Sequence, residues 1–89
     1  MLHIILATLL GWGSEQKVIP FDADLYSKDD ALSQFTPYQG TNYDGYPYTG
    51  YEYNGQKYYN VKYIGKIENR FAPTKKREVD YCISKGLFH

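Results

Sequence analysis

The sequence predicts a small α+β fold, in which a Tyr/Gly-rich turn and β-hairpin segment is followed by a short C-terminal helix. Three observations predict this class. A capped helical segment ends near residue 35, an Asn-Gly pair divides two β-prone stretches near residue 54, and an amphipathic segment ends at a glycine near the C-terminus. Because apolar side chains are few, the alternative is an extended chain that is ordered mainly by its partners.

Length and composition limit both the core and the function. The 89 residues are enough for a single small domain, 1–89, and Leu, Ile, Val and Phe fill only about 22% of the positions. The net charge is zero, so no overall charge attracts the chain to nucleic acid or to an anionic membrane. The single cysteine, Cys82, excludes an internal disulfide. We therefore expect neither a disulfide-stapled fold nor a nucleic-acid partner.

Residues 1–13 form an apolar N-terminal segment that ends at Gly11-Trp12-Gly13. The segment is too short for a membrane span, which needs about 20 apolar residues. A signal peptide is the alternative, although no basic residue precedes Lys17. The periodicity of the segment fits either a helix, with one face made by Leu2, Leu6, Leu9 and Leu10, or a strand buried on both sides, and we favour the strand. We expect the segment to be retained and covered partly by another chain. Its candidate contact residues are Leu2, Ile5, Leu6 and Trp12.

Residues 14–37 form an acidic segment that contains a short helix. Residues 18–21 can form only a short or edge strand, because Pro20 has no backbone N–H to donate. Ser27 and Asp30 match the Ser-x-x-acid capping pattern, which predicts a helix from Ser27 to Gln34. Thr36-Pro37 then ends that helix.

Residues 38–65 contain a pentapeptide repeat of the form x-Gly-x-x-Tyr, with a tyrosine at every fifth position from Tyr38 to Tyr63. Glycines recur at the same spacing and follow turn-forming residues, so we expect a turn at almost every repeat and no regular long strand before about Gly50. Asn54-Gly55 predicts a β-hairpin over the later part of the segment.

Residues 66–89 form a basic segment that ends in a helix. The helix is expected to start at residues 72–74, to bury a stripe made by Val79, Cys82 and Ile83, and to stop at Gly86, with Leu87 or Phe88 folded back over its end. Divided at Gly45, the two halves of the chain carry net charges of −4 and +4. Such a chain can pair with itself head to tail or fold its halves together.

The sequence holds no set of residues that indicates an enzyme. The histidines are His3, inside the apolar run, and His89, the last residue, and Cys82 on an apolar helix stripe is typical of a core residue. Asp22 and Asp24 match only the start of a calcium loop. We therefore expect no catalytic residues, no metal and no cofactor.

The tyrosines are the candidate contact residues, because nine of them between positions 38 and 63 exceed what a thin core can hide. Tyrosine gives wide contact area at low entropic cost. The candidates are Tyr38, Tyr43, Tyr46, Tyr48, Tyr51, Tyr53 and Tyr58.

Over residues 38–65 the Gly/Tyr pattern resembles the repetitive segments of elastic or adhesive structural proteins, and small tyrosine-rich chains resemble accessory proteins of phage particles. We expect a non-enzymatic structural or docking subunit of a larger assembly, either a particle such as a phage virion or a filament. Its partners would be other protein subunits or copies of itself, located in a virion or an extracellular assembly. The alternative is a module that binds carbohydrate or a cell surface through tyrosine stacking platforms.

Overall fold

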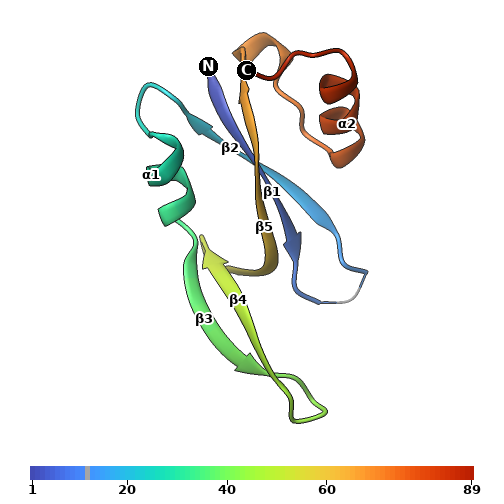
Figure 1. The fold of residues 1–89 in the computed structure, drawn as a ribbon. Coiled ribbons are helices and arrows are strands. Elements are labelled where there is room, and N and C mark those ends of the chain that lie inside the picture. Colours follow the sequence, from blue (N-terminus) through green and yellow to red (C-terminus); the bar gives the residue numbers. More distant parts are fainter. Residues whose placement is uncertain (12) are drawn as a thin grey trace.

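The computed structural model describes residues 1–11 and 13–89, so Trp12 lies outside the described residues. In this part of the chain, a five-stranded antiparallel sheet carries two α-helices and one 3₁₀ turn (Figure 1). The strand order is β2-β1-β5-β4-β3. The small α+β class predicted from the sequence is therefore confirmed. The elements are β1 (Leu2–Leu9), β2 (Gln16–Asp22), α1 (Lys28–Ser33), β3 (Thr36–Thr41), β4 (Pro47–Tyr53), β5 (Gln56–Ile67), η1 (Asn69–Phe71) and α2 (Lys76–Ser84).

The apolar N-terminal run forms β1, which lies between β2 and β5 and is buried on both faces, as predicted for this segment. Ile5 and Ala7 point to the face covered by α1, whereas Ile4 points to the face covered by α2. The premise that the rest of the chain offers few partners for this segment was wrong. Two neighbouring strands and two helices cover it instead.

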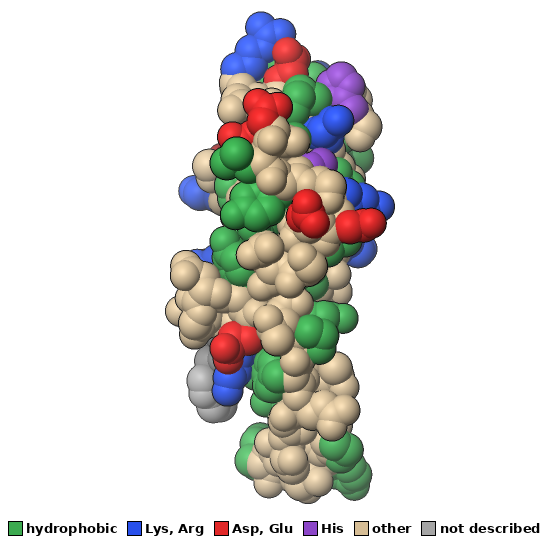
Figure 2. Space-filling model, turned by 90° about the vertical axis from the view of Figure 1, so that its left-hand side faces the viewer, with side chains coloured by type: hydrophobic (Ala, Val, Ile, Leu, Met, Phe, Trp, Pro, Cys, Tyr) green, Lys and Arg blue, Asp and Glu red, His purple; other side chains and the backbone are tan. Residues whose placement is uncertain are grey.

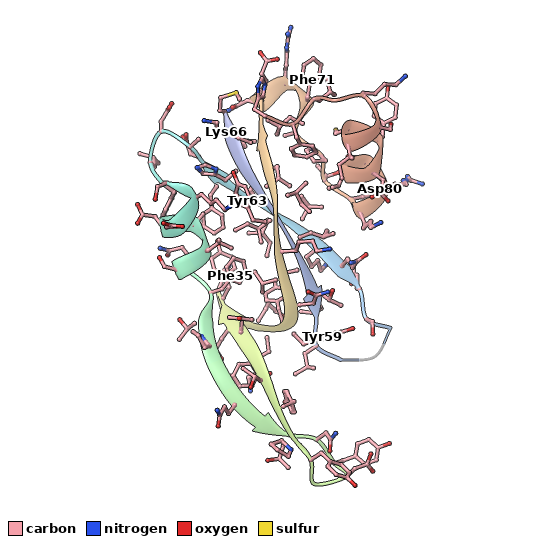
Figure 3. All side chains as sticks on the ribbon, viewed as in Figure 1. Phe35, Tyr59, Tyr63, Lys66, Phe71 and Asp80 are labelled. Carbon is pink, nitrogen blue, oxygen red and sulfur yellow. The ribbon has the colours of Figure 1, made fainter. Side chains whose placement is uncertain are left out.

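Each helix covers one hydrophobic cluster. The α1 cluster consists of Ile5, Ala7, Ile19, Phe21, Ala31, Phe35 and Tyr58, and the α2 cluster consists of Ile4, Ile67, Val79 and Cys82. Aromatic rings fill much of the α1 cluster: the rings of Phe35 and Tyr53 lie 4.8 Å apart, and Figure 3 shows Phe35 and Tyr63 between α1 and the sheet. The chain thus has a core of its own, and the alternative of order supplied mainly by partners does not describe this structure.

The predicted edge strand and the first helix are confirmed. β2 lies at one edge of the sheet, where Pro20 needs no hydrogen-bond partner for its nitrogen. Ser27 caps α1: its Oγ accepts from the Asp30 backbone N–H at 3.0 Å, and Asp30 Oδ2 accepts from the Ser27 N–H at 3.4 Å. This reciprocal capping box starts the helix one residue after Ser27.

The prediction of a turn at almost every repeat was wrong at Gly40 and Gly50, because residues 36–41 and 47–53 form two regular strands, β3 and β4. Turns occur only near Gly45 and at Asn54-Gly55, and the predicted hairpin at Asn54-Gly55 is confirmed. Gly40 and Gly50 lie within strands, where each faces a tyrosine across the ladder. These two glycines provide space for rings and do not make turns.

A bulge in β5 places Tyr58 and Tyr63 on one face. Tyr58 pairs with Leu9 and Asn60 pairs with Thr8, so Tyr59 is the extra residue of the first bulge. An odd step of five would otherwise turn Tyr58 and Tyr63 to opposite faces. Because of the bulge, both pack against the α1 cluster.

The C-terminal helix α2 begins at Lys76, two residues later than the predicted start at residues 72–74. Val79 and Cys82 are buried as predicted, but Ile83 is 53% exposed, so its assignment to the buried stripe was wrong. Gly86 has a φ of 70° and stops the helix, and the Leu87 N–H donates to the Cys82 carbonyl at 3.0 Å. Leu87 and Phe88 then pack on the α2 cluster, as predicted.

Candidate interaction surface

The hairpin formed by β3 and β4 extends away from the rest of the sheet (Figure 1). β3 pairs with β4 from Thr36 to Thr41, whereas β4 pairs with β5 only through residues 51–53. In the sheet ladder, the outer part of the hairpin, residues 38–50, is therefore paired only between its own two strands. We call residues 38–50 the tyrosine arm.

The tip of the tyrosine arm is a turn organised by Asn42. Its side-chain oxygen accepts from the backbone N–H groups of Asp44 and Tyr46, each at 3.0 Å. The Gly45 N–H donates to the Asn42 carbonyl at 2.9 Å, and Gly45 adopts a φ of 88°, which a residue with a Cβ rarely adopts. The tip thus has a defined conformation in the free chain.

Two tyrosines project from this tip. Tyr43 is 99% exposed and Tyr46 is 70% exposed, while most other tyrosines pack against the chain. In Figure 2, where the arm is the lower end of the molecule, hydrophobic side chains lie on both sides of its outer end. Exposed tyrosine rings on a fixed turn can make contacts with little loss of conformational entropy.

The stem of the arm is built from two tyrosine–glycine pairs. Tyr38 lies opposite Gly50, and Tyr48 lies opposite Gly40. The two rings meet edge to face, with centroids 6.0 Å apart, and Lys57 Nζ lies 5.2 Å from the Tyr38 ring centroid. Rings packed over glycines stiffen a two-stranded ribbon that has little other support.

The Tyr38 hydroxyl is buried and, among the described residues, has no hydrogen-bond partner. Burial, followed by the neighbouring Tyr48 hydroxyl and the Glu52 carboxylate, raises the pKa of Tyr38 to about 12. The neutral phenol is therefore the stable form of Tyr38 at all physiological pH values.

The structure separates the predicted contact residues into three groups. Tyr43 and Tyr46 are exposed at the tip, and Tyr38 and Tyr48 are half-buried in the stem. The remainder belong to the body of the sheet: Tyr51, Tyr53 and Leu2 are half-buried, whereas Ile5, Leu6 and Tyr58 are buried in the chain's own core and offer no surface for a partner. Trp12 lies outside the described residues.

A buried polar cluster links three parts of the chain at His3. Its Nδ1 lies 2.9 Å from the Tyr63 hydroxyl, and its Nε2 lies 2.9 Å from the Tyr26 carbonyl oxygen. Because that carbonyl can only accept, Nε2 carries a proton and donates it to the Tyr26 carbonyl. Burial raises the pKa of the Tyr63 hydroxyl. All polar atoms of the ring are satisfied within the chain, which is typical of a structural histidine.

The remaining candidates for chemistry do not form a site. Over residues 1–11 and 13–89, no group of three His, Cys, Asp or Glu side chains is arranged to hold a metal ion, and no pocket is present. Burial raises the pKa of the Cys82 thiol, whose Sγ lies 3.7 Å from the Phe71 carbonyl oxygen. A thiol of this kind is a weak nucleophile at neutral pH. In the same residues, no helix has the length and apolar character needed to cross a membrane.

The comparisons with known proteins do not add a family or a function. Neither protein-family models, nor curated proteins, nor solved structures match the chain. The surface of the molecule is therefore the basis for the function proposed below.

The sequence contained signals for some surface residues that the prediction did not use. The turn at Asp44-Gly45 was among those predicted from the repeat, whereas the part that the Asn42 side chain plays in it was not. Leu25 is 75% exposed and Tyr81 is 59% exposed. Leu25 stands between Asp24 and Tyr26 in an aspartate-rich stretch, where a large apolar side chain is unusual.

Proposed function

We propose that the protein is a non-enzymatic docking subunit of a larger assembly, either a particle or a filament, which it contacts through the tip of the tyrosine arm. The observation that carries the proposal is the full exposure of Tyr43 beside the exposed Tyr46, on a turn whose conformation Asn42 already defines. A preformed turn with aromatic anchors loses little entropy when it enters a partner's recess.

The shape of the chain supports the same proposal. The molecule measures 44 × 26 × 17 Å, and the arm accounts for one end of the long axis (Figure 1). Burying a large apolar side chain contributes about 1.5–3 kcal/mol. Burial of the Tyr43 and Tyr46 rings would therefore contribute substantially to the affinity of a subunit that is held at several points.

The test places a photo-crosslinking amino acid at residue 43 or 46 in the chain expressed in its natural source. We expect both positions to crosslink to one protein at a fixed ratio of the two chains, identified by mass spectrometry. The control position is Tyr59, which is 43% exposed and lies in β5, apart from the tip of the arm (Figure 3). Equal crosslinking from all three positions, or none from residues 43 and 46, would contradict the proposal.

A variant with Tyr43→Ser and Tyr46→Ser tests how much the two rings contribute to the free energy of binding to the assembly. We expect the double variant to keep its fold and to lose at least about tenfold in affinity for the assembly, which corresponds to about 1.4 kcal/mol. Tyr59→Ser should bind like the unmodified chain. If the double variant instead keeps its place in the assembly and loses binding to a glycan array, the carbohydrate module is the correct function.

A further inference from the structure

Opposite charges gather on opposite sides of the sheet. Four aspartates and one lysine lie within residues 22–30, which we call the acidic loop. The acidic loop runs from the end of β2 through the first turn of α1. The helix α1 packs on the Ile5 face of β1, whereas α2 packs on the Ile4 face. Figure 1 shows the two helices on either side of the sheet. The charged residues of the loop are Asp22, Asp24, Lys28, Asp29 and Asp30.

The outer side of α2 carries the opposite charge. Arg77, Tyr81 and Lys85 follow at intervals of four and therefore form one row on the helix, which we call the basic row. All three side chains are exposed, and Lys85 Nζ lies 5.6 Å from the Tyr81 ring centroid. The C-terminal segment that contains the row also has a net positive charge, since residues 66–89 contain six basic and three acidic residues.

The three carboxylates near the basic row already have local partners. Glu68 pairs with Arg70, and Asp80 pairs with Lys76 and lies on the outer side of α2 (Figure 3). Glu78 accepts hydrogen bonds from the backbone and hydroxyl groups of Thr74. Arg77 and Lys85 have no carboxylate within ion-pair distance among the described residues.

The two charged surfaces do not neutralise one another within the chain. In the part of the chain that the structure describes, the ion pairs join Glu15 to Lys17, Glu68 to Arg70 and Lys76 to Asp80, and none connects the acidic loop with the basic row. The −4 and +4 halves of the sequence fold together through the pairing of β1 with β5, yet among the described residues no ion pair joins a charge of one half to a charge of the other.

Each charged surface also has an exposed hydrophobic residue at its centre. Leu25 is 75% exposed within the acidic loop, and Tyr81 is 59% exposed within the basic row. Figure 2, which faces the side of the molecule that carries α1, shows acidic side chains among hydrophobic ones. A hydrophobic centre with a charged rim is the usual anatomy of a protein interface, and here the two rims have opposite signs.

We propose that copies of this chain associate head to tail, with the acidic loop of one copy on the basic row of the next. Leu25 packs on Tyr81, while Asp24 and Asp29 face Arg77 and Lys85. Because the two surfaces lie on opposite sides of the sheet, one copy cannot use both toward the same neighbour, so the contact repeats into a ring or an open filament. This inference names a second partner for the proposed assembly subunit and rests on that role, but a different surface carries it.

The first test measures the mass of the unmodified chain by sedimentation at several protein concentrations, in about 10 mM and about 1 M salt. We expect the average mass to rise past that of a dimer in low salt and to fall to that of the monomer in high salt. A chain that stays monomeric in low salt at every concentration would overturn the proposal without any variant.

The second test exchanges the charges. The loop variant carries Asp24→Lys and Asp29→Lys, and the row variant carries Arg77→Glu and Lys85→Glu. Each variant alone should be monomeric, whereas an equal mixture of the two should associate, and so should the variant with all four changes. The proposal is contradicted if neither the mixture nor the variant with all four changes associates, while circular dichroism shows that the variants are natively folded.

The third test examines the hydrophobic centre and separates this proposal from the docking role. Tyr81→Ser should abolish association and Tyr81→Phe should retain it. The Tyr43→Ser and Tyr46→Ser variant should associate like the unmodified chain, because the arm lies elsewhere. If the chain remains monomeric and its basic row instead binds a labelled oligothymidylate, the row serves nucleic acid and the head-to-tail contact is wrong.

Discussion

Gly50 lies directly opposite Tyr38 in the β3–β4 ladder, and the Tyr38 ring occupies the space that a side chain at residue 50 would need. A Cβ there would stand 2.7 Å from the ring and 2.9 Å from the backbone oxygen of Tyr58. At Gly40 the three atoms nearest to a Cβ would all belong to the Tyr48 side chain, the first at 2.6 Å. A ring can move aside more easily than a backbone oxygen, so the two glycines are not equivalent.

Gly50→Ala should therefore destabilise the chain more than Gly40→Ala. We expect Gly50→Ala to lower the free energy of unfolding by about 1–3 kcal/mol, the usual range for overpacking, and Gly40→Ala to lower it by less. Urea denaturation measures both values, and Thr49→Ala, at an exposed position of the same strand, is the control. Equal losses at Gly40 and Gly50 would show that the Tyr58 oxygen does not limit the space.

Stability should fall at alkaline pH because of buried phenols. Burial raises the pKa of Tyr38 to about 12, and it also raises the pKa values of Tyr58 and Tyr63. In the unfolded chain a tyrosine ionises near pH 10. The folded state thus holds these protons more tightly, so their contribution is complete below about pH 10 and is lost as the pH rises toward about 12. Urea unfolding across this range measures the loss.

Tyr38→Phe is the matched variant for this pH dependence. It should reduce the alkaline loss of stability, and at neutral pH it should cost little, because the hydroxyl that it removes has no hydrogen-bond partner among the described residues. An unchanged alkaline profile in Tyr38→Phe would assign the loss to the other phenols.

His3 and Tyr63 should contribute to stability as a coupled pair. Tyr63→Phe leaves the buried Nδ1 of His3 without its 2.9 Å partner, and His3→Ala removes the link between β1, β5 and the loop at Tyr26. We expect the double variant to be less destabilised than the sum of the two single variants, by about 0.5–3 kcal/mol. Strictly additive losses in urea denaturation would mean that the hydrogen bond contributes nothing.

The sequence predicted the elements whose signals are local. Ser27 with Asp30, Asn54-Gly55 and Gly86 each define a cap or turn through a few neighbouring residues, and all three are found in the structure. The apolar run of β1 was also predicted as a strand, because burial on both faces needs a continuous apolar stretch.

The errors concern residues whose roles depend on distant partners. Gly40 and Gly50 carry no local sign that a tyrosine ring from the facing strand will lie over them, so a turn was the simplest prediction. The two helices that cover β1 come from residues 28–33 and 76–84, and no short-range pattern indicated that they would meet it on opposite faces. The exposed tip at Tyr43 was among the candidates, but the sequence did not separate it from the buried Tyr58.

The single extra residue at Tyr59 restricts how the gene for this chain can change in length. Tyr58 and Tyr63 share a face only because one bulge compensates for an odd step of five. If replication slippage added or removed five codons within β5, every later side chain of that strand would move to the opposite face of the sheet. Viable length variants in this strand should therefore differ by pairs of pentapeptides, or should combine one pentapeptide with the gain or loss of a bulge.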